Sequence, residues 1–231
     1  MPESLLSQSA LLALRELDTC MVSNAIETFK VRLRNTGFAD SSVRCVFEDL
    51  PAMAGYAATA RVRSEDPPVD RQTVHDRSEW WESILEVPAP RIVVLEDMDE
   101  PPGRGAFIGD VHAAILQALG CIGVITNGAV RELPRIRDTG FHLFAGNVAV
   151  SHSYAHIFHL GATVKIGGLE VRPGDLLHGD RHGVLNVPVQ IASQVPAAAA
   201  RLREKETKLI TQCRAGEIPL DQLREIIRVL E

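Results

Sequence analysis

The sequence predicts a single α/β domain with helical segments at both ends. Two apolar runs, 91–95 and 122–126, flank a helical pattern, which is typical of parallel strands joined by a helix. The block 162–189 instead breaks into short strands at glycine and proline pairs, which indicates antiparallel hairpins. Amphipathic patterns near both termini predict further helices.

The first part of the chain changes from helix to strand. Leucines recur at mostly helical spacing over 4–17, and we expect Ser23 or Asn24 to cap a second short helix. Small and β-branched residues then predict a strand over 56–62. The sheet is therefore expected to begin after an all-helical start.

A polar segment follows, bounded by prolines near 67 and at 88. Its apolar side chains gather on one face at helical spacing, which predicts an amphipathic helix. Trp80 and Trp81 lie in this helix. We expect them in the core or in a subunit contact rather than in a ligand site, because large aromatic side chains mostly serve packing.

The central run predicts a strand, a helix and another strand in close succession. After the strand 91–95 come a short strand over 106–108, a helix over 111–119 that is closed by Gly120, and a strand over 122–126. Such a unit places its two strands in parallel. We therefore expect 106–108 and 122–126 to pair.

The remaining segments predict strands and then helices. The run 143–150 is strand-like, and the block 162–189 predicts the hairpins. Apolar residues at helical spacing over 196–213 and over 220–230 predict two amphipathic helices. Since no repeat or low-complexity linker interrupts the chain, we expect one domain over 1–231.

Composition excludes several classes of protein. The 231 residues include 30 acidic and 24 basic side chains, for a net charge of −6, and no basic run provides the field that nucleic-acid binding requires. No apolar stretch approaches the roughly 20 residues of a spanning helix, and the start lacks a secretory signal pattern. We expect a cytoplasmic protein that binds neither nucleic acid nor membrane.

Cysteine usage agrees with that expectation. The four cysteines are scattered without a C-x-x-C pair, and a chain of this size can bury a core without cross-links. We expect reduced thiols, with two disulfides as the alternative. The residues are Cys20, Cys45, Cys121 and Cys213.

Two turns follow predicted strands and open onto helices. One is Gly-Asp-Val-His over 109–112, and the other covers 127–132. Ligands of open α/β sheets bind beyond the carboxyl ends of parallel strands, where helix N-termini offer unpaired N–H groups. If the two strands are neighbours, Asp110, Arg131 and Glu132 converge on one crevice.

These three side chains permit two interpretations. Two carboxylates are hard oxygen ligands suited to Mg²⁺ or Mn²⁺, and a guanidinium beside them can bind a substrate carboxylate or a developing enolate oxygen. The alternative is a helix-capping aspartate at 110 and an exposed Arg131–Glu132 pair, both of which are common. Spacing alone favours the second interpretation.

A family resemblance changes that balance. Asp110 followed by 20 residues and Arg131 resembles the D-x20-R-D signature of the RraA-like family, which contains 4-hydroxy-4-methyl-2-oxoglutarate aldolases, oxaloacetate decarboxylases and the regulator of ribonuclease activity A. Further segments resemble the motifs of that family from about residue 19 to 190. They are Val22-Ser23-Asn24-Ala25-Ile26, Gly55-x-Ala57-x-Thr59, Gly123-Val124, Gly128-Ala129-Val130-Arg131, Gly167-Gly168, Pro173-Gly174-Asp175 and Asp180-x-x-Gly183-Val184.

The resemblance implies a fold and an assembly. The fold is similar to the swivelling β/β/α domain, with a core over about 19–190 and C-terminal helices over 193–231. The family assembles as a trimer or a pair of trimers, with sites at subunit interfaces. A homotrimer or a hexamer is therefore expected.

The resemblance also implies roles for the residues of the signature. In the aldolase branch the first aspartate holds a metal-bound water, the arginine binds the pyruvate moiety, and the final carboxylate ligates the divalent metal directly. These roles fall on Asp110, Arg131 and Glu132. Backbone amides after the first aspartate help to hold the substrate, which points to Val111 and His112.

A glutamate from a neighbouring subunit completes the site in that branch, and Glu206 is the best match here. The sequence departs from the family pattern at two positions. Residue 132 is Glu where the signature has Asp, so the expected metal ligand keeps its charge and gains a methylene. Residue 24 is Asn where the family usually has Asp. Sites held to about 0.5 Å tolerate such changes poorly.

Other polar clusters have structural explanations. His152, His156 and His159 would share a face if 151–160 were helical, but they lack the H-E-x-x-H pattern of zinc enzymes, and the resemblance implies irregular or strand structure there. A second polar cluster lies on a predicted hairpin turn, where polar residues are expected for turn formation alone. It consists of His178, Asp180, Arg181 and His182.

The leading hypothesis is a lyase that depends on Mg²⁺ or Mn²⁺ and acts on a small 2-oxo acid. It would release pyruvate from a 4-hydroxy-2-oxo acid by retro-aldol cleavage, decarboxylate oxaloacetate, or do both. No G-x-G-x-x-G, P-loop or G-x-S-x-G motif suggests a nucleotide cofactor or a serine hydrolase. The alternative is a non-catalytic binding protein of the regulator type.

Overall fold

The computed structural model describes residues 5–68, 74–216 and 218–230. The helices are α1 (Gln8–Arg15), α2 (Thr19–Glu27), α3 (Arg77–Leu85), α4 (Asp110–Ala118), α5 (Leu133–Arg137), α6 (Val189–Ala192), α7 (Val195–Ala215) and α8 (Leu220–Leu230). The strands are β1 (Arg44–Cys45), β2 (Met53–Arg63), β3 (Arg91–Asp97), β4 (Ala106–Ile108), β5 (Cys121–Thr126), β6 (Ala129–Val130), β7 (His142–Ala145), β8 (Asn147–Val148), β9 (His156–Leu160), β10 (Val164–Ile166), β11 (Leu169–Val171), β12 (Leu176–Asp180) and β13 (Gly183–Asn186). The predicted α/β class with helical ends is confirmed.

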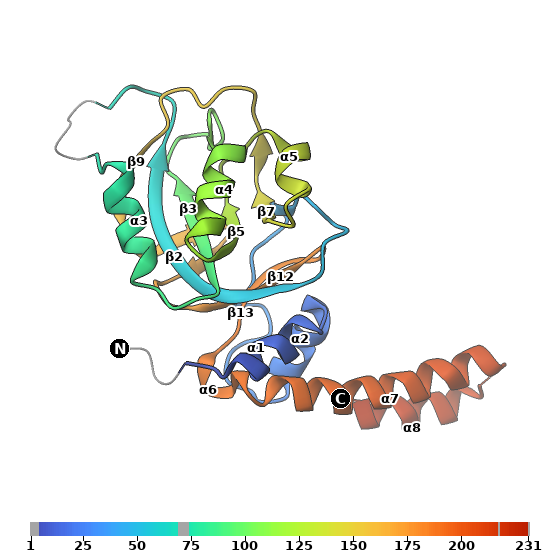
Figure 1. Cartoon of the computed structure of the whole chain (residues 1–231). Helices are drawn as coiled ribbons and strands as arrows, with labels where there is room; N and C mark the ends of the chain where they lie inside the picture. The colour runs from blue at the N-terminus through green and yellow to red at the C-terminus, as the bar shows by residue number, and fades with distance from the viewer. Residues whose placement is uncertain (1–4, 69–73, 217, 231) are drawn as a thin grey trace.

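A mixed sheet forms the centre of the molecule. Its strand order is β1-β7-β5-β3-β2-β12-β13, and β2, β3, β5 and β7 run in parallel. The long strand β2 pairs with β12 near its start and with β9 near its end, both antiparallel. Figure 1 shows β2 curving strongly between these partners, so that the sheet is almost closed like a barrel.

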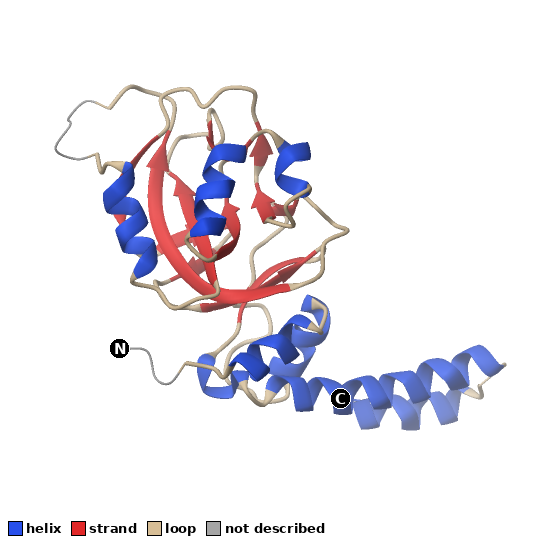
Figure 2. Ribbon diagram, in the orientation of Figure 1, coloured by secondary structure: helices blue, strands red, loops and turns tan. Residues whose placement is uncertain are grey.

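The two faces of the sheet are covered differently. Helices α3, α4 and α5 lie over one face, as Figure 2 shows, while the hairpin β10–β11 packs against the other. Alternation along β3 matches this arrangement: Val93 and Leu95 belong to the core cluster on the helical side, and Ile92 and Val94 to the cluster beneath the hairpin. Trp80 is buried in the first cluster, as expected for a packing residue.

The expected pairing of 106–108 with 122–126 is wrong. Both edges of β5 are occupied by β3 and β7 in the main sheet, whereas β4 pairs in parallel with β6 in a small separate sheet that also contains β8. The segment after β5 therefore supplies the neighbour of β4. Helix α4 connects the two sheets, and its N-terminus lies at the carboxyl ends of β4 and β6.

Three local expectations also need correction. Helix α2 begins at Thr19 because Asp18 Oδ1 accepts the N–H of Met21 at 2.7 Å, so Ser23 and Asn24 lie inside the helix rather than at its cap. Helix α1 is shorter than the expected 4–17, of which residue 4 lies outside the described residues. Residues 156–160 form strand β9, which rules out the helical alternative for them.

The terminal helices lie at the amino-terminal end of the parallel strands (Figure 1). Helix α1 packs on β2 and α7, and α2 packs on β12, β13 and α7. Helices α7 and α8 extend away from the sheet as an antiparallel arm. The predicted helices over 196–213 and 220–230 are confirmed. Among the described residues, none of the helices is long and apolar enough to cross a membrane. All four cysteines are free thiols.

Candidate active site

Two neighbouring strand ends form the framework of the site. Ile108 of β4 and Val130 of β6 are register partners, and the N–H of Arg131 donates to the carbonyl of Ile108 at 3.0 Å. The chain leaves β4 through Gly109 into α4 and leaves β6 through Arg131 into α5. Because parallel strands end at the same edge, the residues at 109–110 and 131–132 are brought together.

Glu132 connects the two turns. Its Oε2 accepts the N–H of Asp110 at 3.0 Å, and its Oε1 accepts Nη2 of Arg131 at 2.9 Å. The residue has a φ of 59°, in the left-handed region that a non-glycine residue enters at a cost of about 1 kcal/mol or more. Gly109 makes room for the carboxylate, because a Cβ at that position would collide with Glu132 Oε2.

Asp110 begins α4 and faces the same space. Its Oδ2 accepts Nη1 of Arg135 at 2.9 Å, and its Oδ1 accepts the N–H of Val111 at 2.7 Å. The hydrogen bond from Arg135 is the main cause that lowers the pKa of the Asp110 carboxyl below its ordinary value. Asp110 is therefore an anion at neutral pH.

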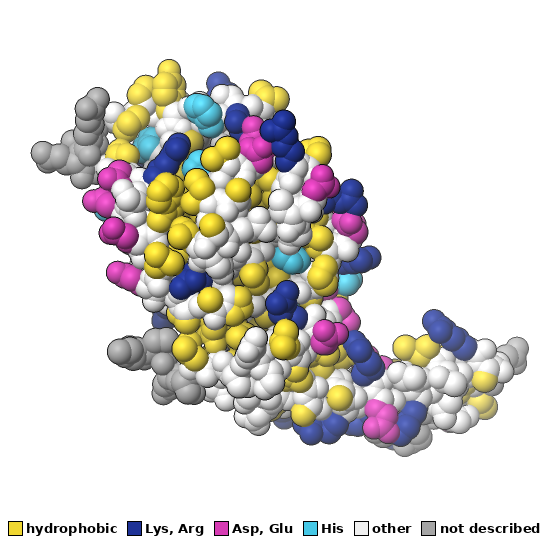
Figure 3. All heavy atoms as spheres, viewed as in Figure 1, with side chains coloured by type: hydrophobic (Ala, Val, Ile, Leu, Met, Phe, Trp, Pro, Cys, Tyr) yellow, Lys and Arg dark blue, Asp and Glu magenta, His cyan; other side chains and the backbone are white. Residues whose placement is uncertain are grey.

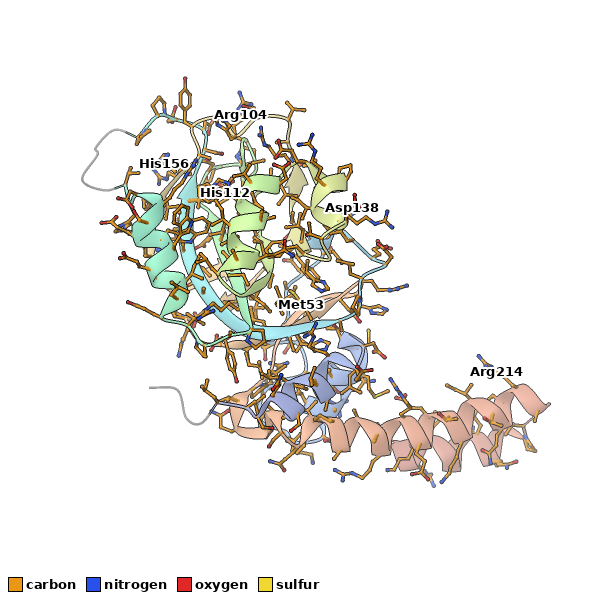
Figure 4. All side chains as sticks on the ribbon, in the orientation of Figure 1. Met53, Arg104, His112, Asp138, His156 and Arg214 are labelled. Atoms are coloured by element: carbon orange, nitrogen blue, oxygen red, sulfur yellow. The ribbon has the colours of Figure 1, made fainter. Side chains whose placement is uncertain are left out.

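A pocket of about 300 Å³ opens beside these side chains. Its inner wall includes Phe107 and His112, whose rings are stacked with centroids 5.1 Å apart, and Trp80 packs edge-on against Phe107 at 5.3 Å. Figure 4 shows His112 between α4 and α3. Burial, followed by the positive charges of Arg77 and Arg131, lowers the pKa of His112 to about 4, so its ring is neutral at pH 7.

A comparison with models of protein families shows to which family this chain belongs. The model described as "RraA-like: Aldolase/RraA" matches residues 19–186, which is well over half of the chain. This protein belongs to the RraA-like family. A relative in Halalkalibacterium halodurans carries the provisional name 4-hydroxy-4-methyl-2-oxoglutarate aldolase. It is 25% identical over 159 residues, which cover 66% of this chain and 75% of that protein.

Solved structures show the same fold. An uncharacterised protein from Pseudomonas syringae has a TM-score of 0.73 at 22% identity, over 97% of both chains. A Streptomyces coelicolor protein, described as an unusual member of the RNase ES inhibitor RraA family, has a TM-score of 0.70 at 19% identity. That match covers 90% of this chain and all of the other. The RraA-like fold is thus present with its terminal helices.

The structure brings together most of the residues that the sequence singled out. Asp110, Val111, His112, Arg131 and Glu132 all line the pocket. Their contacts agree with a shared site, while the role of each residue remains a prediction. Figure 3 shows charged and histidine side chains gathering at this end of the molecule.

Glu206 is not near the pocket of its own chain. It belongs to α7, at the opposite end of the molecule from the start of α4 (Figure 1). Its expected role is in the site of a neighbouring subunit, which a single chain does not test. Among the described residues, the carboxylates that line the pocket are those of Asp110 and Glu132.

The other polar clusters do not form a second centre. His152 lies at the edge of the pocket, while His156 and His159 lie on β9. No three His, Cys, Asp or Glu side chains in the described part of the chain are grouped so that they could hold a metal. His178 and Asp180 are buried in β12 rather than placed on the hairpin turn, and both contact Thr19 of α2.

Arg77 and Phe107 also line the pocket, although the sequence did not single them out. Phe107 lies in the middle of β4, where an apolar residue is expected for packing alone. Arg77 is the first residue of α3, and its position depends on how α3 packs against α4. No local pattern signals that contact.

The donor set is compatible with Mg²⁺ or Mn²⁺. Both ions prefer oxygen ligands, and Mg²⁺ is usually bound by one or two carboxylates together with several waters. Asp110 and Glu132 supply two adjacent carboxylates, and the side chain of Arg135, which pairs with Asp110, is 79% exposed. The residues present thus fit a divalent ion. Water, substrate or a second subunit would supply its remaining ligands.

Proposed function

We propose that this RraA-like protein is a divalent-metal-dependent lyase. It would cleave a small 4-hydroxy-2-oxo acid to pyruvate by retro-aldol chemistry, decarboxylate oxaloacetate, or do both. The main support is the convergence of Arg131, Asp110 and Glu132 on one pocket at the ends of β4 and β6. The provisional aldolase name of the Halalkalibacterium halodurans relative agrees with this class of reaction.

Arg131 is the residue that would bind the substrate carboxylate. Its guanidinium is held by Glu132 Oε1 at 2.9 Å and by the carbonyl of Val150 at 3.4 Å, and its side chain is 30% exposed. A guanidinium fixed in this way can still offer N–H groups to a planar carboxylate and to the enolate oxygen beside it. Negative charge that develops when the C–C bond breaks is thereby stabilised.

Asp110 is the residue that would handle the proton. In retro-aldol cleavage the 4-hydroxyl group loses its proton, the C3–C4 bond breaks, and its electron pair enters the C2–C3 enolate, which then takes a proton to give pyruvate. A lowered pKa keeps Asp110 ionised, so that its Oδ atoms accept a hydrogen bond from the water molecule that carries the proton. In decarboxylation, CO₂ leaves in place of the aldehyde or ketone, and the same enolate forms.

The divalent ion would be held directly by Glu132 and through water by Asp110, and it would supply Lewis acidity toward the 2-oxo acid. We further propose a homotrimer or hexamer in which Glu206 of a neighbouring subunit completes the site. The described lining residues of the pocket supply two carboxylates, which supports a third contribution from outside the chain.

A non-catalytic regulator is the alternative. Glu132 replaces the aspartate of the family signature, and within the chain it is engaged by Arg131 and by the N–H of Asp110. A carboxylate that serves only to join two turns would keep the fold and lose the chemistry.

The two hypotheses are separated by a pyruvate-release assay with oxaloacetate and a panel of 4-hydroxy-2-oxo acids. We expect release above the background of the free metal, with Mg²⁺ or Mn²⁺ required and EDTA inhibitory. Arg131→Ala should abolish this release, whereas Arg172→Ala, at an exposed position next to the β10–β11 hairpin and outside the pocket, should not change it. Equal release by the wild type and Arg131→Ala would overturn the assignment.

A further inference from the structure

The small sheet beside the pocket is too short to fix its own strand register. Strands β4 and β6 have three and two residues, and their pairing is irregular between Ala106 and Ile108. Strand pairs of this size are marginal alone, and a slip by one residue would turn each side chain to the opposite face. The positions of Asp110 and Glu132, which follow these strands, therefore depend on what holds the chain before it enters them.

Asp97, the last residue of β3, holds the segment that enters β4. Its Oδ2 accepts the N–H of Gly103 at 2.8 Å, and its Oδ1 accepts the N–H of Asp99 at 3.0 Å. Asp99 extends these contacts, because its Oδ2 accepts the hydroxyl of Ser64 at 2.9 Å, and Ser64 Oγ accepts the N–H of Gly105 at 2.9 Å. The hydrogen bonds thus hold the link between β3 and β4 as far as the residue directly before β4.

The same residue is bonded to the segment that enters β6. Asn127 lies between β5 and β6, and its side-chain amide spans the backbone of Asp97. Asn127 Oδ1 accepts the N–H of Asp97 at 2.8 Å, and Asn127 Nδ2 donates to the carbonyl of Asp97 at 2.9 Å. Gly128 follows, and a Cβ there would lie 2.8 Å from Asp97 Oδ2. Asp97 therefore contacts the segments that precede both β4 and β6.

Asp97 is costly to bury. It is 5% exposed, and no basic side chain in the described part of the chain forms an ion pair with it. Burial raises the pKa of its carboxyl above the ordinary value, and the N–H groups of Asp99 and Gly103 offset part of this effect. A buried carboxylate without a positive partner lowers the stability of a fold, and features of this kind are concentrated at functional sites. The carboxylate at position 97 is therefore explained by the site better than by stability.

We propose that Asp97 is a positioning residue for the divalent ion: by fixing the chain before β4 and β6, it sets the separation of the carboxylates of Asp110 and Glu132. Its effect on the ion rests on the proposed function, whereas its effect on the two strands does not. Mg²⁺ accepts oxygen ligands at about 2.0–2.1 Å with little tolerance, so a shift of about 1 Å between the two turns would remove a ligand. Asp97 does not line the pocket and acts through the strands.

The test uses three variants and a matched control. Asp97→Ala removes both acceptors, Asp97→Asn keeps one acceptor for two N–H donors, and Asn127→Ala removes the amide that joins the two segments. The control is Asp180→Ala. Asp180 is 8% exposed and also accepts two backbone N–H groups, from Thr19 at 2.9 Å and from His182 at 2.8 Å, but it lies on β12 against α2. The control therefore disturbs a buried carboxylate without touching the small sheet.

Amide hydrogen exchange reports on the two strands without any metal. The N–H of Arg131 donates to the carbonyl of Ile108, and the N–H of Asp110 donates to Glu132 Oε2. Relative to the amides of β3 and β5, we expect both to exchange about tenfold faster or more in the two alanine variants at 97 and 127 than in the control. The asparagine variant should lie between, and it replaces the alanine variant at 97 if that protein does not fold. Equal relative exchange in all the proteins would overturn the proposal.

Calorimetry with Mn²⁺ alone measures the consequence for the ion. We expect Asp97→Ala and Asn127→Ala to bind Mn²⁺ about tenfold more weakly or worse, and Asp180→Ala to stay within about twofold of the wild type. Wild-type affinity in both folded test variants would overturn the role of Asp97 toward the ion. A wild type that binds no Mn²⁺ would overturn the metal-dependent lyase instead, and the exchange measurement would still decide whether Asp97 positions the strands.

Discussion

Glu132 makes two contacts at the site that depend on the length of its side chain, which is one methylene longer than that of aspartate. From its left-handed backbone conformation it reaches the N–H of Asp110 and the guanidinium of Arg131 at the same time. The space for its carboxylate depends on the missing side chain of Gly109, whose φ of −132° any residue can adopt. A side chain at position 109 would thus displace the carboxylate of Glu132, while the backbone conformation itself would permit one.

The metal preference should reveal whether Glu132 is a ligand. Mg²⁺ demands a nearly ideal octahedral coordination shell, whereas Mn²⁺ accepts a more distorted one. The longer glutamate should therefore disturb the binding of Mg²⁺ more than the binding of Mn²⁺. We therefore expect Mn²⁺ to support more activity than Mg²⁺, and Glu132→Asp to narrow the gap. If the site is adapted to glutamate, the substitution should lower activity with both ions.

Calorimetry with each ion on the wild type, Glu132→Asp and Glu132→Ala gives a readout independent of turnover. A ligand role requires a loss of affinity in the alanine variant. Identical affinities in all three proteins would show that Glu132 only joins the two turns, which would favour the regulator hypothesis.

At the residue scale, the sequence predicts that Asp110, Arg131 and Glu132 meet, but it does not predict that Arg77 lines the same pocket. Asp110, Arg131 and Glu132 follow strands directly, so their meeting depends only on two strands ending at one edge. Arg77 is brought to the same pocket through the packing of Trp80 on Phe107. That contact joins segments about 30 residues apart and leaves no mark in a local pattern.

At the scale of elements, strand existence was easier to predict than strand pairing. Apolar runs identify β3 and β5, and glycine pairs identify the β10–β11 hairpin. The pairing of β4 depends on which edges remain free once β3, β5 and β7 have joined, and on the two-residue strand β6, which is too short to produce a periodic signal. The prediction that the turns at 109–112 and 127–132 lie close together is nevertheless correct, because β6 follows β5 within a few residues.

One buried imidazole contributes to the attachment of α1 and α2 to the sheet. His178 Nε2 lies 3.0 Å from the carbonyl of Leu14, which can only accept, so this nitrogen carries the proton. Because burial lowers the pKa of His178 and keeps the ring neutral, Nδ1 accepts from the hydroxyl of Thr19 at 3.0 Å. A single tautomer therefore joins both helices to β12.

Removing the donor to that imidazole should loosen the attachment. Thr19→Val keeps the shape of the side chain and leaves the buried Nδ1 of His178 without a partner, at a cost of about 1–3 kcal/mol. Urea unfolding measures the loss. Thr36→Val, which removes an exposed hydroxyl, should cost less than about 0.5 kcal/mol. Equal stability of the two variants would contradict the role of the contact.

At the scale of the whole molecule, buried neutral histidines should make the fold sensitive to acid. Burial lowers the pKa of His142 from the ordinary 6.5 to about 4, so the folded ring stays neutral where the unfolded chain is protonated. Stability from this group is complete above pH of about 6.5 and falls as the pH drops toward about 4. The slope is about 1.4 kcal/mol per pH unit for each such group.

His142→Leu should therefore flatten the acid side of the stability profile. Urea unfolding of the wild type and the variant between pH 7.5 and about 4 isolates the contribution of this residue, because all other titrating groups are shared. We expect the wild type to lose more stability than the variant over that interval. Parallel profiles would show that His142 is not protonated differently in the folded and unfolded chains.

Under the proposed function, the site depends on the assembly of several chains. The arm formed by α7 and α8 projects from the sheet and exposes Ile210, Leu220 and Ile227, which are 41–61% exposed. Exposed apolar side chains on neighbouring helices are typical of interaction surfaces. We expect light scattering at micromolar concentration to give the mass of a trimer or hexamer, and a monomer would contradict the shared-site hypothesis.

If Glu206 acts in a neighbouring subunit, Arg131→Ala and Glu206→Ala should each abolish pyruvate release alone. Mixing and reassembling the two variants should then restore part of the release, because some interfaces combine an intact Arg131 with an intact Glu206. Restoration of the correct mass without any activity would place the third carboxylate elsewhere.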